Sequence, residues 1–208
     1  MRRQFNKEEL SRYVAGTQRA VPITGGVGCM CPANRPAASC DVPRSPREAH
    51  REEKGIGLSP LDRRPWQVLV VDDNRGDSDL LCMALLEWES EVSVHVVEDG
   101  DLALKYLRSE WPYCDARLPD LVLLDLHLPR KDGIEVLSEM RRDPELRNIP
   151  VVIMTSSDSR SDVVRAYGSN VNSFITKSAD AGEFFSRMRA LERYWFHTVQ
   201  LPSDEKLS

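Results

Sequence analysis

The chain has 208 residues, of which 41% are hydrophobic, and a formal net charge of -5. The charge is unevenly distributed, because residues 1–65 hold 12 basic and 7 acidic residues and residues 66–208 hold 16 basic and 26 acidic residues. The acidic second part argues against nucleic-acid binding, and no apolar run approaches the ~18 residues of a membrane span. The five cysteines form no dense framework, which favours a reduced, cytoplasmic location.

Residues 1–65 have little hydrophobic periodicity and contain seven prolines. Such a stretch buries too little apolar surface to offset its ordering entropy, so we predict a disordered or low-order extension, with a short helix near Lys7 to Val14. Three cysteines and one histidine in it are residue types that bind zinc, but a C-x-C spacing with a distant fourth ligand favours unpaired thiols instead. These residues are Cys29, Cys31, Cys40 and His50.

From Trp66 onward, five short apolar runs alternate with five stretches that have apolar residues at helical spacing. This alternation predicts an α/β fold with a five-stranded, parallel, doubly wound sheet of the flavodoxin-like type and right-handed crossovers. The domain is expected to span 66–200, followed by a tail at 201–208. Strands are expected at 68–71, 92–97, 121–124, 151–154 and 171–175. The first helix is expected to begin at a cap formed by Asp77 or Ser78, and the other four are expected over 102–107, 134–140, 163–167 and 181–197.

Polar side chains stand where four of these strands end: Asp72 and Asp73, Asp125, Thr155 and Lys177. The carboxyl ends of parallel strands share one edge of the sheet, and ligands bind there at the switch point. Three carboxylates so close would repel one another unless a cation lay between them, and Mg2+ with its oxygen ligands fits best. A lysine and a hydroxyl could hold phosphoryl oxygens. The set predicts a phosphoryl site with a carboxylate nucleophile.

Each of these residues has an ordinary structural interpretation when taken alone. An aspartate after a strand is usually a turn former or a helix cap, a threonine at a strand end is favoured by its β-branched shape, and a lysine there is usually solvated. Their occurrence together and in order, at successive strand ends, favours the functional interpretation.

Four motifs resemble the receiver domain of two-component response regulators: VVDDN at 70–74, LLDLHLPRKDG at 123–133, MTS at 154–156 and FITK at 174–177. The resemblance covers about Gln67 to Thr198. It implies a signalling phosphoacceptor that catalyses only its own phosphorylation and dephosphorylation, and a sensor histidine kinase as partner.

The resemblance also implies a role for each matching residue. Asp125 would be the phosphoacceptor. Asp73, Asp125 and the carbonyl of His127 would bind Mg2+, and Asp72 would act largely through a metal-bound water. Lys177 would pair with the phosphoryl group. The switch residues would be the hydroxyl of Thr155 and the aromatic ring of Phe174.

A narrower similarity connects the chain to the small regulators partnered with bacterial phytochrome histidine kinases. It rests on DNRGD at 73–77, PRKDG at 129–133, DPEL at 143–146, VNSF at 171–174 and YWFHTVQLP at 194–202. Two residues depart from the pattern, since Arg75 and Ser178 stand where such proteins usually have proline. This similarity implies a kinase of the phytochrome type.

Only 31 residues follow Lys177, which leaves no room there for a DNA-binding output domain. We therefore expect signalling through the surface of the domain itself, and no nucleic-acid or membrane partner. A homodimer is expected through the fourth helix, fifth strand and fifth helix of the domain. This surface carries the aromatic residues Tyr167, Phe174, Tyr194, Trp195 and Phe196, although a capping role for the tail remains an alternative.

Three other functions remain alternatives. A Mg2+-dependent phosphatase with an aspartyl nucleophile usually carries an acid two residues after that nucleophile, where this chain has His127. A pseudo-receiver, a pure binding module, is disfavoured by the intact Asp73, Asp125, Thr155 and Lys177. A flavodoxin-like cofactor binder would need a phosphate-binding loop after the first strand, where two aspartates would repel phosphate.

Overall fold

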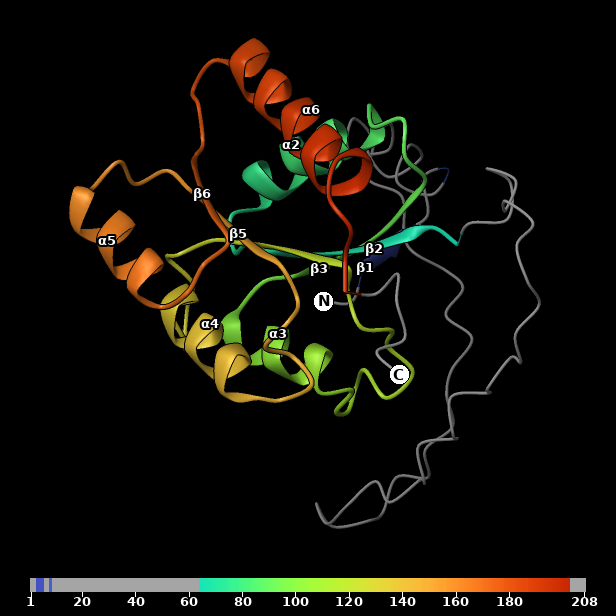
Figure 1. Cartoon of the computed structure of the whole chain (residues 1–208), viewed down its shortest axis with the longest axis vertical. Coiled ribbons are helices and arrows are strands. Elements are labelled where there is room, and N and C mark those ends of the chain that lie inside the picture. Colours follow the sequence, from blue (N-terminus) through green and yellow to red (C-terminus); the bar gives the residue numbers. More distant parts are fainter. Residues whose placement is uncertain (1–2, 6–7, 9–63, 203–208) are drawn as a thin grey trace. The chain divides into compact units, whose positions relative to one another are not determined.

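The computed structural model describes residues 3–5, 8 and 64–202, and a six-stranded sheet runs through them (Figure 1). Five neighbouring strands pair in parallel, as the alternation of elements predicts, and β1 joins one edge antiparallel. In spatial order the strands are β1 (Arg3–Phe5), β3 (Val92–Val97), β2 (Trp66–Val71), β4 (Leu121–Leu124), β5 (Val151–Thr155) and β6 (Ser173–Thr176).

Helices cover both faces of the sheet. One face carries α2 (Arg75–Leu86) and α6 (Ala181–His197), and the other carries α3 (Gly100–Leu107), α4 (Gly133–Arg142) and α5 (Arg160–Gly168) (Figure 1). Each face has its own hydrophobic core, so successive residues of β2 alternate between the two. Burial on both faces explains why the strands are unbroken apolar runs.

The helix caps fix where the loops at the carboxyl edge of the sheet end. Asn74 caps α2, because its side chain accepts hydrogen bonds from the backbone N–H groups of Gly76 and Asp77; the prediction of a cap at Asp77 or Ser78 is therefore wrong. Asp132 forms a capping box with Glu135 at the start of α4. The loop between β4 and α4 thus ends at Asp132.

Gly133 lies against the backbone of this loop. Its N–H donates to the carbonyl of Leu126, and a Cβ atom at this position would lie 2.2 Å from the carbonyl oxygen of Asp125. Only glycine allows such a close backbone approach. Asp125 is therefore held by direct packing of the start of α4 against its own peptide group.

Two strands differ from the predictions. β6 begins two residues later than expected, because the N–H of Val171 still closes the turn after α5 by donating to Ala166. β1 was not predicted, since three residues are too few for an alternating pattern; it pairs with β3 from Arg3 opposite Val96 to Phe5 opposite Val94.

The other expectations for the first 65 residues lie almost wholly outside the described residues. Glu8 is helical, but the rest of the helix predicted near Lys7 to Val14 is not described, and neither are the cysteines and histidine considered for zinc. Of the predicted tail, Leu201 is buried. Among the helices that are described, none combines the length and apolarity needed to cross a membrane.

Candidate functional site

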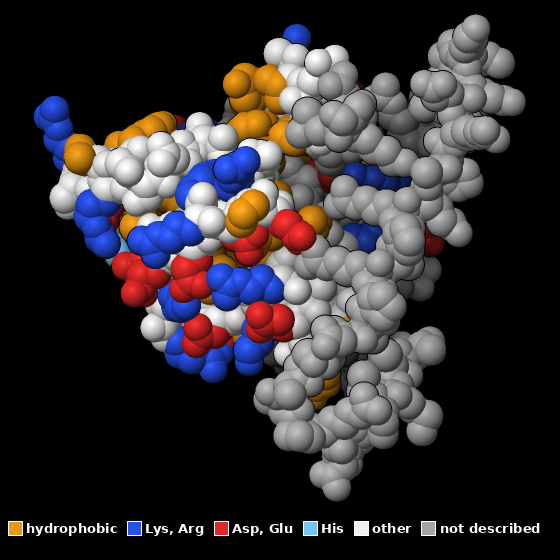
Figure 2. All heavy atoms as spheres, turned by 60° about the horizontal axis from the view of Figure 1, so that its bottom comes forward, with side chains coloured by type: hydrophobic (Ala, Val, Ile, Leu, Met, Phe, Trp, Pro, Cys, Tyr) orange, Lys and Arg blue, Asp and Glu red, His pale blue; other side chains and the backbone are white. Residues whose placement is uncertain are grey.

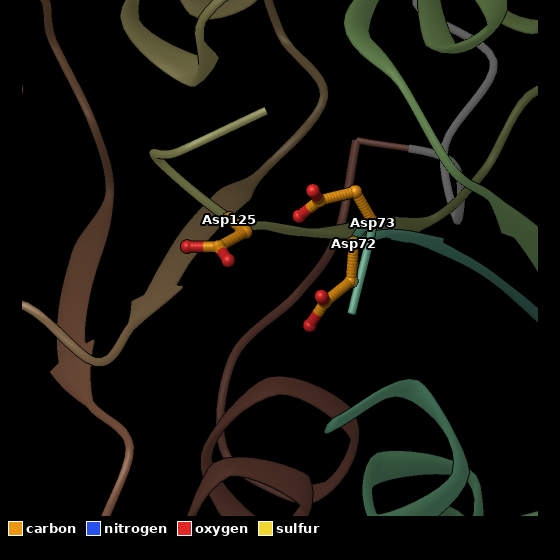
Figure 3. Close-up of side chains that lie close together, drawn as sticks. All are labelled: Asp72, Asp73 and Asp125. Atoms are coloured by element: carbon orange, nitrogen blue, oxygen red, sulfur yellow. The ribbon is translucent and has the colours of Figure 1, made fainter. Parts of the chain in front are cut away.

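Three carboxylates converge where β2 and β4 end. Asp72 and Asp73 follow β2, Asp125 follows β4, and one oxygen from each lies within 4.8 Å of the other two. Figure 3 shows Asp72 and Asp73 leaving the end of β2 on opposite sides, with Asp125 beside them at the end of β4. The two strands are neighbours in the sheet although they are not consecutive in the chain, so the cluster lies at the switch point, as predicted.

The donor set suits a hard divalent cation. All three ligand groups are carboxylate oxygens, which such cations prefer, and their mutual repulsion would be relieved by a bound ion. Asp72 and Asp125 are buried whereas Asp73 is exposed, so the cluster opens to solvent on one side. An ion held there could keep several of its water molecules, as Mg2+ does.

Lys177 brings a positive charge into the same site. Its Nζ lies 2.7 Å from Asp72 Oδ2, 2.8 Å from Asp77 Oδ2 and 3.3 Å from Asp125 Oδ2. The backbone N–H of Lys177 donates to the carbonyl of Thr155, which anchors the loop after β6 to the end of β5. Burial alone lowers the pKa of Lys177, but the charge of Asp72 and the hydrogen bonds to Asp72 and Asp77 outweigh it and raise the pKa.

The surroundings of Asp72 shift its pKa. Burial raises its pKa to about 6, although the charge of Lys177 and the hydrogen bonds from Lys177 and from the backbone of Asn74 act in the opposite direction. The charge of Asp125 adds to the rise. Burial therefore contributes more to this rise than the charge of Asp125 does, and a cation bound beside Asp72 would oppose it by favouring the charged carboxylate.

The raised pKa of Asp72 predicts that metal-free protein loses stability as the pH rises from 3.8 to about 6. In this window the folded protein holds the proton of Asp72 more tightly than the unfolded chain does, so the free energy of unfolding falls with pH. Thermal unfolding in chelator should show this loss in the wild type and a smaller one in Asp72→Asn. An identical pH dependence in both proteins would contradict the assignment.

Thr155 is fully buried at the end of β5 and is connected to the start of α5. Its Oγ1 accepts a hydrogen bond of 3.2 Å from the N–H of Ser157, and Ser157 Oγ donates to Asp162 Oδ2 at 2.7 Å. His127 Nε2 lies 3.9 Å from the same oxygen of Asp162, and its side chain is 67% exposed. The imidazole therefore lies beside the first turn of α5.

Phe174 lies on β6, half buried against the core under α3, α4 and α5. It also lines an open groove of about 510 Å³ between β6 and α6, together with Tyr194 and Trp195. Tyr194 is 52% exposed and Tyr167 on α5 is 54% exposed, whereas Trp195 is buried in the core. Aromatic side chains thus occupy both the core and the surface of this part of the protein.

The loop that follows Asp125 is joined to neighbouring helices by ion pairs. Arg130, at a φ of 67°, pairs with the buried Asp99 that caps α3, and Lys131 pairs with Glu139 of α4. Acidic and basic side chains intermingle on the surface over α3 and α4 (Figure 2). These contacts fix the loop that carries His127.

The structure brings together Asp72, Asp73, Asp125 and Lys177 as the sequence predicts, with Thr155 beside them. It adds residues that the sequence analysis did not assign to the site. Asp77 binds Lys177, and Ser157 and Asp162 connect Thr155 to α5. The only sequence signal for Asp77 is its place one helical turn beyond the acidic pair.

Comparison with known proteins agrees with this geometry. The profile of the response regulator receiver domain matches residues 68–189. Response regulator Rcp1 of Synechocystis sp. is 37% identical over 146 residues, which are 70% of this chain and 99% of that protein. The crystal structure of the phosphorylated cyanobacterial phytochrome response regulator RcpA is 41% identical, with a TM-score of 0.64, and covers 67% of this chain and 99% of its own.

A second solved structure, the Mn2+-bound form of Rcp1, is 37% identical with a TM-score of 0.63 and covers 66% of this chain and 99% of its own. The divalent cation bound by this relative agrees with the suitability of the acidic cluster in this chain for such a cation. Because the profile spans more than half of the chain and these relatives match over almost their whole length, the chain belongs to the response regulator receiver domain family of two-component signalling proteins.

Proposed function

We propose that this chain is a cytoplasmic, single-domain response regulator that accepts a phosphoryl group from a sensor histidine kinase on Asp125. The observation that carries the proposal is the convergence of Asp125 with two further carboxylates and the Nζ of Lys177 at the switch point of the sheet. Transfer of a phosphoryl group to an aspartate requires carboxylates, a lysine and a hydroxyl close together, and this site has all three.

The side chains supply distinct parts of the reaction. Asp125 Oδ1 accepts a 2.7 Å hydrogen bond from the N–H of Leu126, which orients the carboxylate, while Oδ2 faces Lys177. An oxygen of Asp125 forms the new P–O bond as the P–N bond of the donor phosphohistidine breaks, and the departing nitrogen keeps the electron pair. Lys177 donates to an oxygen of the phosphoryl group and stabilises its charge.

We assign the cation as Mg2+. Asp73, Asp125 and the carbonyl of His127 would hold it, with Asp72 acting largely through a bound water. When bound, it would neutralise charge on the carboxylates and on the phosphoryl oxygens. Labelling by a small phosphodonor is therefore expected to stop in chelator and to return when Mg2+ is added.

The phosphoryl group would act on the surface through Thr155 and Phe174. The hydroxyl of Thr155 turns towards the new oxygens and gives up its hydrogen bond from Ser157, and Phe174 moves into the space that becomes free. The changed surface comprises α5, β6 and α6, where Tyr167 and Tyr194 are exposed. We propose that this surface forms a homodimer, which sedimentation before and after phosphorylation tests; a monomer in both states would contradict it.

The phosphoacceptor role is tested by incubating the full chain with acetyl phosphate and Mg2+ and measuring its intact mass. The wild type should gain one phosphoryl group, and Asp125→Asn should gain none. Asp101→Asn, a half-exposed carboxylate at the start of α3, is the matched control and should label like the wild type. An unlabelled wild type, or equal labelling of Asp125→Asn, would defeat the assignment.

The similarity to phytochrome response regulators supports a kinase of the phytochrome type as the donor. A purified phytochrome histidine kinase, autophosphorylated with labelled ATP, is expected to transfer its label to this chain faster than a histidine kinase from an unrelated sensor class does. Equal rates from both kinases would contradict the pairing.

A further inference from the structure

Lys177 has three N–H bonds and lies within reach of three carboxylates. The contact with Asp77, at 2.8 Å, is nearly as short as the contact with the buried Asp72, at 2.7 Å, and shorter than the contact with Asp125, at 3.3 Å. The ammonium group is therefore held from the side of α2 as well as from the sheet.

Asp77 differs from the other two carboxylates because it is not part of the acidic cluster. It lies in the first turn of α2, its side chain is 31% exposed, and the cluster consists of Asp72, Asp73 and Asp125. A divalent cation bound by the cluster would satisfy the charges of Asp72 and Asp125 and would repel the ammonium group. The charge of Asp77 would remain available to Lys177.

We propose, on the basis of the function proposed above, that Asp77 is a positioning residue that keeps Lys177 beside Asp125 while the cluster holds a divalent cation. Because Asp77 takes one of the N–H bonds of Lys177, the ammonium group binds Asp72 and Asp125 less strongly, and their oxygens are left to the cation. A hollow of about 310 Å³, lined by Asp77, Lys177 and Ser178 among others, lies next to this contact. When the cluster holds a cation and Asp77 no longer holds Lys177, the hollow gives the repelled ammonium group space to move into.

The proposal is tested with Asp77→Asn, which removes the charge and keeps the size of the side chain. Lys177 then pairs only with Asp72 and Asp125 and competes with the cation for both. The affinity of the unphosphorylated full chain for Mg2+, measured by calorimetry, is expected to fall on the order of tenfold. Asp77→Glu should restore most of the affinity, and Asp77→Ser should behave like Asp77→Asn.

A double-mutant cycle with Lys177→Met separates positioning from a simple effect of charge. In the Lys177→Met background there is no ammonium group to position, so adding Asp77→Asn should change the affinity for Mg2+ by no more than about twofold. Mutations at independent sites depart from additivity by a similar amount. An equal loss in both backgrounds would show that Asp77 acts directly on the cation and would overturn the proposal. Unchanged affinity in the single variant Asp77→Asn would also overturn it.

The rate of labelling gives a second measurement. At saturating Mg2+, acetyl phosphate should label Asp77→Asn more slowly than the wild type, because Lys177 is less well placed for the phosphoryl oxygens. Calorimetry needs no phosphodonor, so the two proposals can fail separately. A wild type that gains no phosphoryl group would defeat the proposed function, whereas unchanged affinity for Mg2+ in Asp77→Asn would defeat only the role of Asp77.

Discussion

Replacing Gly133 by alanine should destabilise the receiver domain by about 3 kcal/mol or more, at the upper end of what overpacking costs. The new Cβ would lie 2.2 Å from the carbonyl oxygen of Asp125 and 2.9 Å from the Cα of Leu126. Both are backbone atoms, so no side-chain rotation can relieve the clash. The loop after β4 would have to move, and the hydrogen bond from Gly133 to Leu126 would be lost with it.

Urea unfolding followed by circular dichroism measures the effect, and Gly168→Ala is a matched control. Gly168 ends α5, and a Cβ there would meet nothing within 4 Å. Because alanine restricts the unfolded chain, this change should be neutral or stabilising by up to about 1 kcal/mol. Equal stabilities of the two variants would show that the loop yields easily and that Gly133 does not fix Asp125.

Replacing Lys177 by methionine should affect both stability and chemistry. In chelator, the buried Asp72 and Asp125 lose the ammonium group between them, and removal of one partner from a buried charge pair costs about 3–5 kcal/mol. Mg2+ should recover much of this loss, because it would supply positive charge to the same carboxylates. Labelling of Asp125 at saturating Mg2+ should still fall about 10²-fold or more, as for removal of one preorganised donor.

Thermal unfolding with and without Mg2+, combined with the rate of labelling, tests this prediction. Lys105→Met is the control, since Lys105 is an exposed lysine of α3, and both measurements should match those of the wild type. If Lys177→Met were equally stable in chelator and in Mg2+, the cation and the lysine would not share the same carboxylates.

The sequence was sufficient to predict those parts of the fold that depend on local patterns. The last helix begins and ends where its apolar spacing indicates, at Ala181 and His197. The convergence of Asp72, Asp73 and Asp125 was predictable because alternating strands and helices imply a parallel sheet, and such a sheet brings its carboxyl ends to one edge.

Contacts that depend on how elements are rotated against one another could not be predicted. Asp77 reaches Lys177 because of the angle at which α2 lies on the sheet, which its apolar spacing does not specify. The connection from Thr155 through Ser157 to Asp162 depends on the path of a loop. β1 depends on an exposed edge of β3, which is remote in sequence and carries no signal within Arg3–Phe5.

The pairing of β1 with β3 affects how copies of this protein could assemble. A sheet that grows by edge pairing needs two open edges, and unpaired edges are templates for such growth. In the part of the chain that the structure describes, the edge beside β3 is formed by β1, whose three residues offer only a short template, while β6 forms the opposite edge next to the exposed Tyr194. Two copies joined through their β6 sides would form a closed twofold dimer, because each copy uses the same surface. A third copy could not join at that surface, so an open-ended fibre would not form there.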